Sequence, residues 1–131
     1  MTGPTTWAFD VDGCLIDSLT GSSLRPGAAE LLGQLRDDGH RLLLWSAGGA
    51  EYARLRATDH GIAGFFDGFF AKTDRDVDGR YIPPWPATAT RVLFVDDRPE
   101  DMPVGAQVIG VSPYLSDNPH DRGLEKISDR R

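Results

Sequence analysis

Cysteine and long apolar runs are scarce in this sequence. Cys14 is the one cysteine among 131 residues, so an internal disulfide is impossible and a reducing, cytoplasmic location is expected. No apolar run approaches the length of a membrane-spanning helix, and residues 1–6 lack the pattern of a signal peptide. We therefore expect a protein that neither enters nor crosses a membrane.

Basic residues are outnumbered by acidic ones. The sequence has 14 Lys and Arg residues against 20 Asp and Glu, which gives a net charge of −6 and a pI near 4.9. Nucleic-acid-binding proteins usually present a basic face, so this balance argues against a nucleic-acid partner. It does not exclude a small phosphorylated substrate, because a lysine or a bound cation can reverse the charge locally.

What the sequence does contain is a regular alternation of strand and helix patterns. Strands are expected over residues 6–9, 41–45, 69–71, 91–95 and 108–111, and helices over 26–38, 50–59 and 121–127. The alternation predicts a Rossmann-like three-layer α/β/α sandwich, in which helices cover both faces of a mostly parallel central sheet. The length and the hydrophobic fraction of 40% suit one domain over residues 1–131.

A pair of carboxylates follows the first expected strand. Asp10 stands at the end of the apolar run Thr6–Phe9, Asp12 comes two residues later, and Gly13 allows a sharp turn. Ligands of open α/β sheets bind beyond the carboxyl ends of the strands, where one carboxylate can attack and the other can transfer protons. Two like charges so close together imply a neighbouring cation. The pattern indicates phosphoryl transfer through an aspartyl-phosphate intermediate.

The later strands end on polar residues that suit the same chemistry. Ser46 and Ala47 follow the second strand, where a hydroxyl and free backbone N–H groups at a helix start form an anion site. Lys72 supplies a cation after the third strand, and the fourth strand runs into the acidic segment 96–101. The expected edge of the sheet thus combines a nucleophile, an anion site, a lysine and an acidic cluster.

This order of motifs resembles the haloacid dehalogenase superfamily of phosphohydrolases. The segment Asp10–Leu15 is similar to its first motif, Leu44–Ser46 to its second, Lys72 to its third and Asp96–Asp101 to its fourth. The resemblance implies a haloacid dehalogenase-like fold and a magnesium-dependent phosphatase that hydrolyses a phosphate monoester. Cys14 departs from the family, which usually has threonine there. Its thiol is a weaker hydrogen-bond partner, and we expect it to be buried and structural.

The resemblance also implies roles for the matching residues. Asp10 is implied as the nucleophile, and Asp12 as the general acid that protonates the leaving alcohol and the base that activates water. Ser46, Ala47 and Lys72 are implied to bind the phosphate oxygens and to neutralise the charge that spreads over them.

The implied cofactor is Mg²⁺. Its expected ligands are a carboxylate oxygen of Asp10, the backbone carbonyl of Asp12 and the carboxylate of Asp97, since this ion prefers oxygen donors. Asp101 is expected behind these ligands, where it would orient metal-bound water or the lysine. For Asp96 two roles stay open, because it can reach the ion or only cap the turn.

The spacing of the motifs predicts an enzyme without a cap domain. Many members of the superfamily insert a cap between the first and second motifs or between the second and third. The intervals from Asp12 to Ser46 and from Ser46 to Lys72 are too short to hold one. A hairpin that turns at Asp78-Gly79, within residues 73–86, is expected to form part of the rim of an open site.

Two alternatives to this function stay open at the level of sequence. The segment Ser46–Ala53 is similar to the corresponding part of the RNA polymerase II tail phosphatase group, which would imply a phosphoprotein substrate. A receiver-like phospho-Asp signalling domain also combines Asp, Lys and magnesium. Its acidic pair precedes the phosphorylated Asp, whereas Asp96-Asp97 comes last here. Substrate identity and oligomeric state are not encoded in any readable motif.

Overall fold

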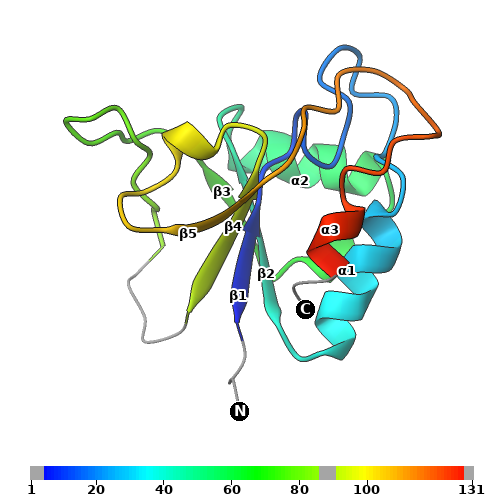
Figure 1. The fold of residues 1–131 in the computed structure, drawn as a ribbon, viewed down its shortest axis with the longest axis horizontal. Coiled ribbons are helices and arrows are strands. Elements are labelled where there is room, and N and C mark those ends of the chain that lie inside the picture. The colour runs from blue at the N-terminus through cyan, green and yellow to red at the C-terminus, as the bar shows by residue number, and fades with distance from the viewer. Residues whose placement is uncertain (1–4, 86–90, 129–131) are drawn as a thin grey trace.

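A parallel sheet forms the centre of the structure. The computed structural model describes residues 5–85 and 91–128. Its sheet has five strands in the order β3-β2-β1-β4-β5, and every pair of neighbours is parallel. The strands are β1 (Thr6–Phe9), β2 (Arg41–Ser46), β3 (Gly68–Ala71), β4 (Val92–Asp96) and β5 (Gln107–Gly110), as Figure 1 shows. The predicted α/β class with a Rossmann-like sheet is confirmed.

Short helices lie between the strands and after the last of them. They are α1 (Ala28–Asp37), α2 (Ala50–Asp59), α3 (Glu125–Ser128) and the 3₁₀-helices η1 (Ala63–Phe65) and η2 (Pro99–Asp101). The first begins later than predicted, because Pro26 and Gly27 form a turn in which Gly27 has a φ of 85°. None of the helices in the described ranges has the length and hydropathy that a membrane crossing requires.

The larger part of the core lies between the sheet and the helices. Leu31, Leu32 and Leu35 of α1 pack with alternate strand residues such as Phe9 and Leu44, all of them buried. α1 and α3 lie next to each other on this side of the sheet (Figure 1). The amphipathic pattern of residues 26–38 therefore predicted the buried face of α1 correctly.

The opposite face of the sheet is covered differently from the prediction. Leu43 and Trp45 of β2 and Phe94 of β4 pack there against Met102 and Trp85. In the described ranges this layer is built from the hairpin after β3 and the turn of η2, whereas the alternation of strands and helices predicted helices on both faces of the sheet. Consecutive prolines just before Trp85 are incompatible with a helix, which explains the difference.

A buried arginine fixes the loop that follows β1. Arg25 is 1% exposed, and its Nε atom lies 2.7 Å from Oδ1 of Asp121. Its Nη1 donates to the carbonyl of Cys14 (3.2 Å), and its Nη2 donates to the hydroxyl of Ser112 (3.1 Å). A buried charge is tolerated only with such partners, so the loop after Asp10 and the chain beyond β5 are held together.

We predict that Arg25→Met lowers the free energy of unfolding by about 3 kcal/mol, because it leaves the carboxylate of Asp121 largely buried without its partner. Urea unfolding followed by circular dichroism measures the change. Arg122→Met is the matched control, since Arg122 forms an exposed ion pair with Glu125 and should change stability little. Equal effects of the two substitutions would contradict the structural role of Arg25.

Candidate active site

The register of the sheet brings the predicted site residues to one edge. Phe9 is paired with Leu44 and with Val95, so Asp10 emerges level with the ends of β2 and β4. Ser46 is the last residue of β2 and Asp96 the last of β4, and Lys72 follows β3 directly. Because the strands are parallel, the side chains that the sequence separates widely meet at their common carboxyl edge.

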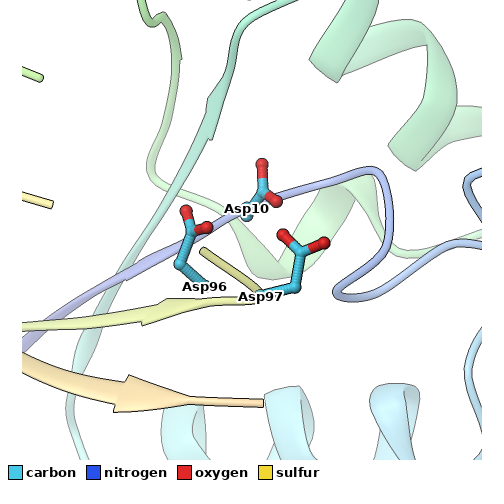
Figure 2. A group of neighbouring side chains, drawn as sticks. All are labelled: Asp10, Asp96 and Asp97. Carbon is cyan, nitrogen blue, oxygen red and sulfur yellow. The ribbon is translucent and has the colours of Figure 1, made fainter. Parts of the chain in front are cut away.

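Three carboxylates form the centre of this edge. Oxygen atoms of Asp10, Asp96 and Asp97 all lie within 4.8 Å of one another. Figure 2 shows Asp10 at the end of β1 and the other two at the end of β4, with their carboxylates gathered in one region. Asp96 is 3% exposed, so part of this negative charge is held away from water. Such a cluster requires positive charge close by.

Lys72 supplies part of that positive charge. The side chain is buried, and its Nζ lies 2.9 Å from Oδ1 of Asp10 and 2.8 Å from Oδ2 of Asp96. Burial alone would lower the pKa of Lys72, but the two carboxylates outweigh it and raise the pKa above its usual value. Burial also raises the pKa of Asp10, an effect that Lys72 opposes. One ammonium group therefore faces more negative charge than it can neutralise.

The donor set of the cluster fits a hard divalent cation. Its carboxylate oxygens are the ligands that magnesium and calcium prefer. Gly13 makes room for the carboxylate of Asp97, because a Cβ atom on Gly13 would lie 2.5 Å from Oδ2 of Asp97. With a φ of 79°, Gly13 also occupies a conformation that other residues rarely adopt. The glycine after Asp12 thus allows Asp97 to approach the loop.

Asp12 points toward helix α2 and is held there by a tyrosine. The hydroxyl of Tyr52 lies 2.8 Å from Oδ1 and 3.0 Å from Oδ2 of Asp12. Gly48 permits this arrangement, since a Cβ atom there would lie 2.6 Å from the Tyr52 ring. This contact was not predicted from the sequence. The available signal was the expected helix after Ser46, whose first turn carries Tyr52 toward the strand edge.

The phosphate-binding candidates stand beside the carboxylates. Ser46 is 2% exposed, and its Oγ accepts a hydrogen bond from the backbone N–H of Gly48 at 3.0 Å. The same oxygen retains its own proton as a donor for a ligand. Ala47 is exposed and precedes α2, where backbone N–H groups have no partner within the helix.

One cavity of about 270 Å³ connects these residues. All eight residues that the sequence analysis assigned to the site line it: Asp10, Asp12, Ser46, Ala47, Lys72, Asp96, Asp97 and Asp101. Four more line its wall and rim: Arg75, Tyr81, Arg98 and Met102. The expected hairpin forms part of the rim, although its loop is longer than the two residues predicted, because the backbone of Asp76 pairs with that of Arg80.

The acidic residues after β4 have distinct partners. Asp96 uses one carboxylate oxygen for Lys72 and the other to accept the backbone N–H of Arg98 at 2.8 Å, so it caps the turn and also belongs to the carboxylate cluster. Asp101 accepts a hydrogen bond from Nε of Arg98 at 2.8 Å. In the structure it is therefore Asp96, together with Asp10, that orients the lysine.

Cys14 is fully buried beneath the site. Its thiol donates a weak hydrogen bond to the carbonyl of Val95 at 3.7 Å. Burial raises the pKa of Cys14 well above its usual value, so the thiol stays neutral. The prediction of a buried thiol is confirmed.

The fold is similar to that of a solved core domain. No family model and no curated protein matches the chain. Among solved structures, it is similar to the NMR structure of the core domain of "a putative phosphoglycolate phosphatase from Streptococcus pneumoniae TIGR4". The TM-score is 0.57 at 16% sequence identity, and the alignment covers 98% of this chain and 96% of that one. At this identity the similarity establishes the fold alone.

We predict that Asp12→Asn lowers the pKa of Tyr52. Burial and then the hydrogen bond to Asp12 raise this pKa in the structure, and the substitution removes the carboxylate that disfavours a phenolate. The tyrosine should therefore ionise at lower pH than in the wild type. The difference in phenolate absorbance between each protein and its Tyr52→Phe derivative isolates this residue. Glu51→Gln, an exposed change on the same helix, should leave the pKa unaltered; an equal shift would contradict the contact.

Proposed function

We propose that this protein is a magnesium-dependent phosphatase that hydrolyses a phosphate monoester through an aspartyl-phosphate intermediate on Asp10. The observation that carries the proposal is the cluster of Asp10, Asp96 and Asp97 around Lys72, with Asp12 beside it in the same cavity. The fold is similar to that of a core domain described as belonging to "a putative phosphoglycolate phosphatase", which is consistent with this activity.

Asp10 is the nucleophile in this proposal. Its carboxylate oxygen bonds to phosphorus while the bond from phosphorus to the leaving oxygen breaks. Two unit charges 4 Å apart repel by about 4 kcal/mol at an effective dielectric constant of about 20, so the approach of a carboxylate to a phosphate needs compensation. Lys72, 2.9 Å from Asp10, provides part of it.

The carboxylates of Asp10, Asp96 and Asp97 would hold the magnesium ion, with the backbone carbonyl of Asp12 as a further oxygen ligand. When bound, the ion supplies the remaining positive charge between nucleophile and phosphate. Asp96 joins the sequence-based ligand set because its oxygen lies within the same 4.8 Å group, which favours the first of its two expected roles.

Asp12 transfers the protons. Its carboxyl group protonates the leaving alcohol and then accepts a proton from the water that cleaves the aspartyl phosphate. Such general acid–base assistance typically contributes about 10²–10⁴ in rate. Tyr52 keeps the carboxylate of Asp12 in one orientation through its two short contacts, so the proton is delivered from a defined position.

The remaining polar groups hold the phosphate. The hydroxyl of Ser46 and the backbone N–H of Ala47 bind non-bridging oxygens, and Lys72 neutralises their growing charge. Asp101 contributes indirectly, by holding Arg98 at the rim.

We propose further that the enzyme works without a cap. The interval between the first and second motifs contains a loop and α1, and that between the second and third contains α2 and η1. The hairpin after Lys72 and the turn that carries Arg98 take over the rim. A small phosphorylated molecule suits the cavity volume of about 270 Å³, which is near the lower end for ligand pockets.

We predict that Asp10→Asn abolishes the release of phosphate while the protein remains folded, because the amide cannot form the acyl phosphate. Phosphate release is measured over a panel of phosphorylated metabolites and phosphopeptides, with magnesium and with a chelator. The wild type should require magnesium. Activity that persists in Asp10→Asn would refute the nucleophile, release from phosphopeptides alone would favour a phosphoprotein phosphatase, and a long-lived phospho-Asp10 without release would favour a receiver-like role.

A second prediction concerns the metal site. Asp97→Asn should raise the melting temperature of the chelator-treated protein, because it removes one of three mutually repelling carboxylates. It should also weaken the stabilisation that magnesium gives to the wild type. Thermal unfolding with and without magnesium measures both effects. Asp78→Asn, in the exposed hairpin loop, is the control. Unchanged stabilisation by magnesium in Asp97→Asn would exclude this residue as a ligand.

A further inference from the structure

Arg75 places a positive charge on the rim of the cavity but has no role in the proposed phosphate chemistry. Arg75 lies on the hairpin that follows Lys72, directly opposite Tyr81 in an isolated antiparallel bridge. Both Arg75 and Tyr81 line the cavity that contains the carboxylate cluster. The side chain of Arg75 is exposed, whereas that of Lys72 is buried at the centre of the site.

The guanidinium of Arg75 is held in one geometry. Its Nη1 donates to the carbonyl of Gly79 at 2.6 Å, and its Nη2 donates to the hydroxyl of Tyr81 at 2.7 Å. Its Cζ lies 4.1 Å from the centroid of the Tyr81 ring, in the range of a cation–π contact. These contacts leave further N–H donors of the guanidinium without a described partner, and the orientation of the group is already fixed before a ligand binds.

The positive charge of Arg75 is close to that of the phosphate site. The same Tyr81 ring lies 5.6 Å from Nζ of Lys72. The two cationic groups are therefore separated by no more than the sum of their distances to the ring. A single small ligand can contact both if it carries two anionic groups on a short spacer.

The two rim arginines differ in their partners. Arg98 is paired with Asp101 at 2.8 Å. By contrast, the ion pairs of 4.0 Å or less that the structure shows over residues 5–85 and 91–128 do not include Arg75. The adjacent Asp76 directs one carboxylate oxygen to the backbone N–H groups of Asp78 and Arg80, which shapes the loop. The charge of Arg75 is therefore available to a ligand.

We propose that Arg75, supported by Tyr81, is a subsite for a second anionic group of the substrate. This inference rests on the proposed phosphatase function and narrows its substrate class to small phosphate monoesters that carry a second anion, either a carboxylate or another phosphate. Guanidinium groups pair with both through two parallel N–H···O bonds, and one such interaction at the rim distinguishes these substrates from uncharged monoesters.

Binding of unreactive phosphonates tests the subsite separately from catalysis. Calorimetry with magnesium present would compare propylphosphonate with 3-phosphonopropionate, in which a carboxylate replaces the terminal methyl group. We expect the second ligand to bind the wild type at least about tenfold more tightly, which corresponds to about 1.4 kcal/mol. A bisphosphonate on the same spacer shows whether a carboxylate or a phosphate is preferred. The cationic 3-aminopropylphosphonate should bind most weakly.

Variants assign the effect to Arg75. In Arg75→Gln the advantage of 3-phosphonopropionate should disappear, while propylphosphonate binds within about twofold of the wild type, which also shows that the site is intact. Arg75→Lys should keep part of the advantage, because it retains the charge but not the planar fork. Arg122→Gln, which removes an exposed positive charge outside the cavity lining, should behave like the wild type.

The outcomes separate this inference from the proposed function. Equal binding of propylphosphonate and 3-phosphonopropionate to the wild type, or a preference for the ammonium ligand, would overturn the subsite even if phosphate release depends on Asp10. An advantage that survives Arg75→Gln would also overturn it. An advantage that depends on Arg75 in a protein without phosphatase activity would support the anion subsite and refute the proposed reaction.

Discussion

The rest of the site depends on a buried imbalance of charge at the edge of the sheet. Asp10 and Asp96 share one ammonium group, that of Lys72, and Asp97 adds a third carboxylate within 4.8 Å. The parallel register forces these groups together, since each follows or ends a neighbouring strand. A protein that needed only stability would not concentrate like charges in this way. In the proposed function, this imbalance is the property that would attract a cation and, through it, a phosphate.

Much of this edge could be predicted because each residue stands directly after an apolar strand. The carboxyl ends of parallel strands lie at the same edge of a sheet. Residues that directly follow such strands can therefore be predicted to lie close together without knowledge of the packing. Tyr52 and Arg98 were harder to predict. The first reaches the site through the rotation of a helix, and the second through the turn that Asp96 caps. Hydrophobic periodicity alone does not predict the direction in which either side chain points.

The layer on the second face of the sheet was mispredicted for a related reason. Alternation of strands and helices predicts helices on both faces. In the described residues, however, the connection from β3 to β4 contains a hairpin and the connection from β4 to β5 contains a single 3₁₀ turn. Trp85 compensates by packing its ring against Trp45 and Phe70, so aromatic side chains replace a helix as the cover.

The contact between Arg25 and Asp121 has a consequence for how the protein is made. The loop after β1 is translated before the other strands, yet its buried arginine meets the carboxylate of Asp121 only after that residue has left the ribosome. The backbone N–H of Tyr114 also donates to the carbonyl of Gly13 at 2.7 Å. The geometry around Asp12 can therefore be completed only after residues 114 and 121 have emerged, and by then all five strands of the described sheet have been translated.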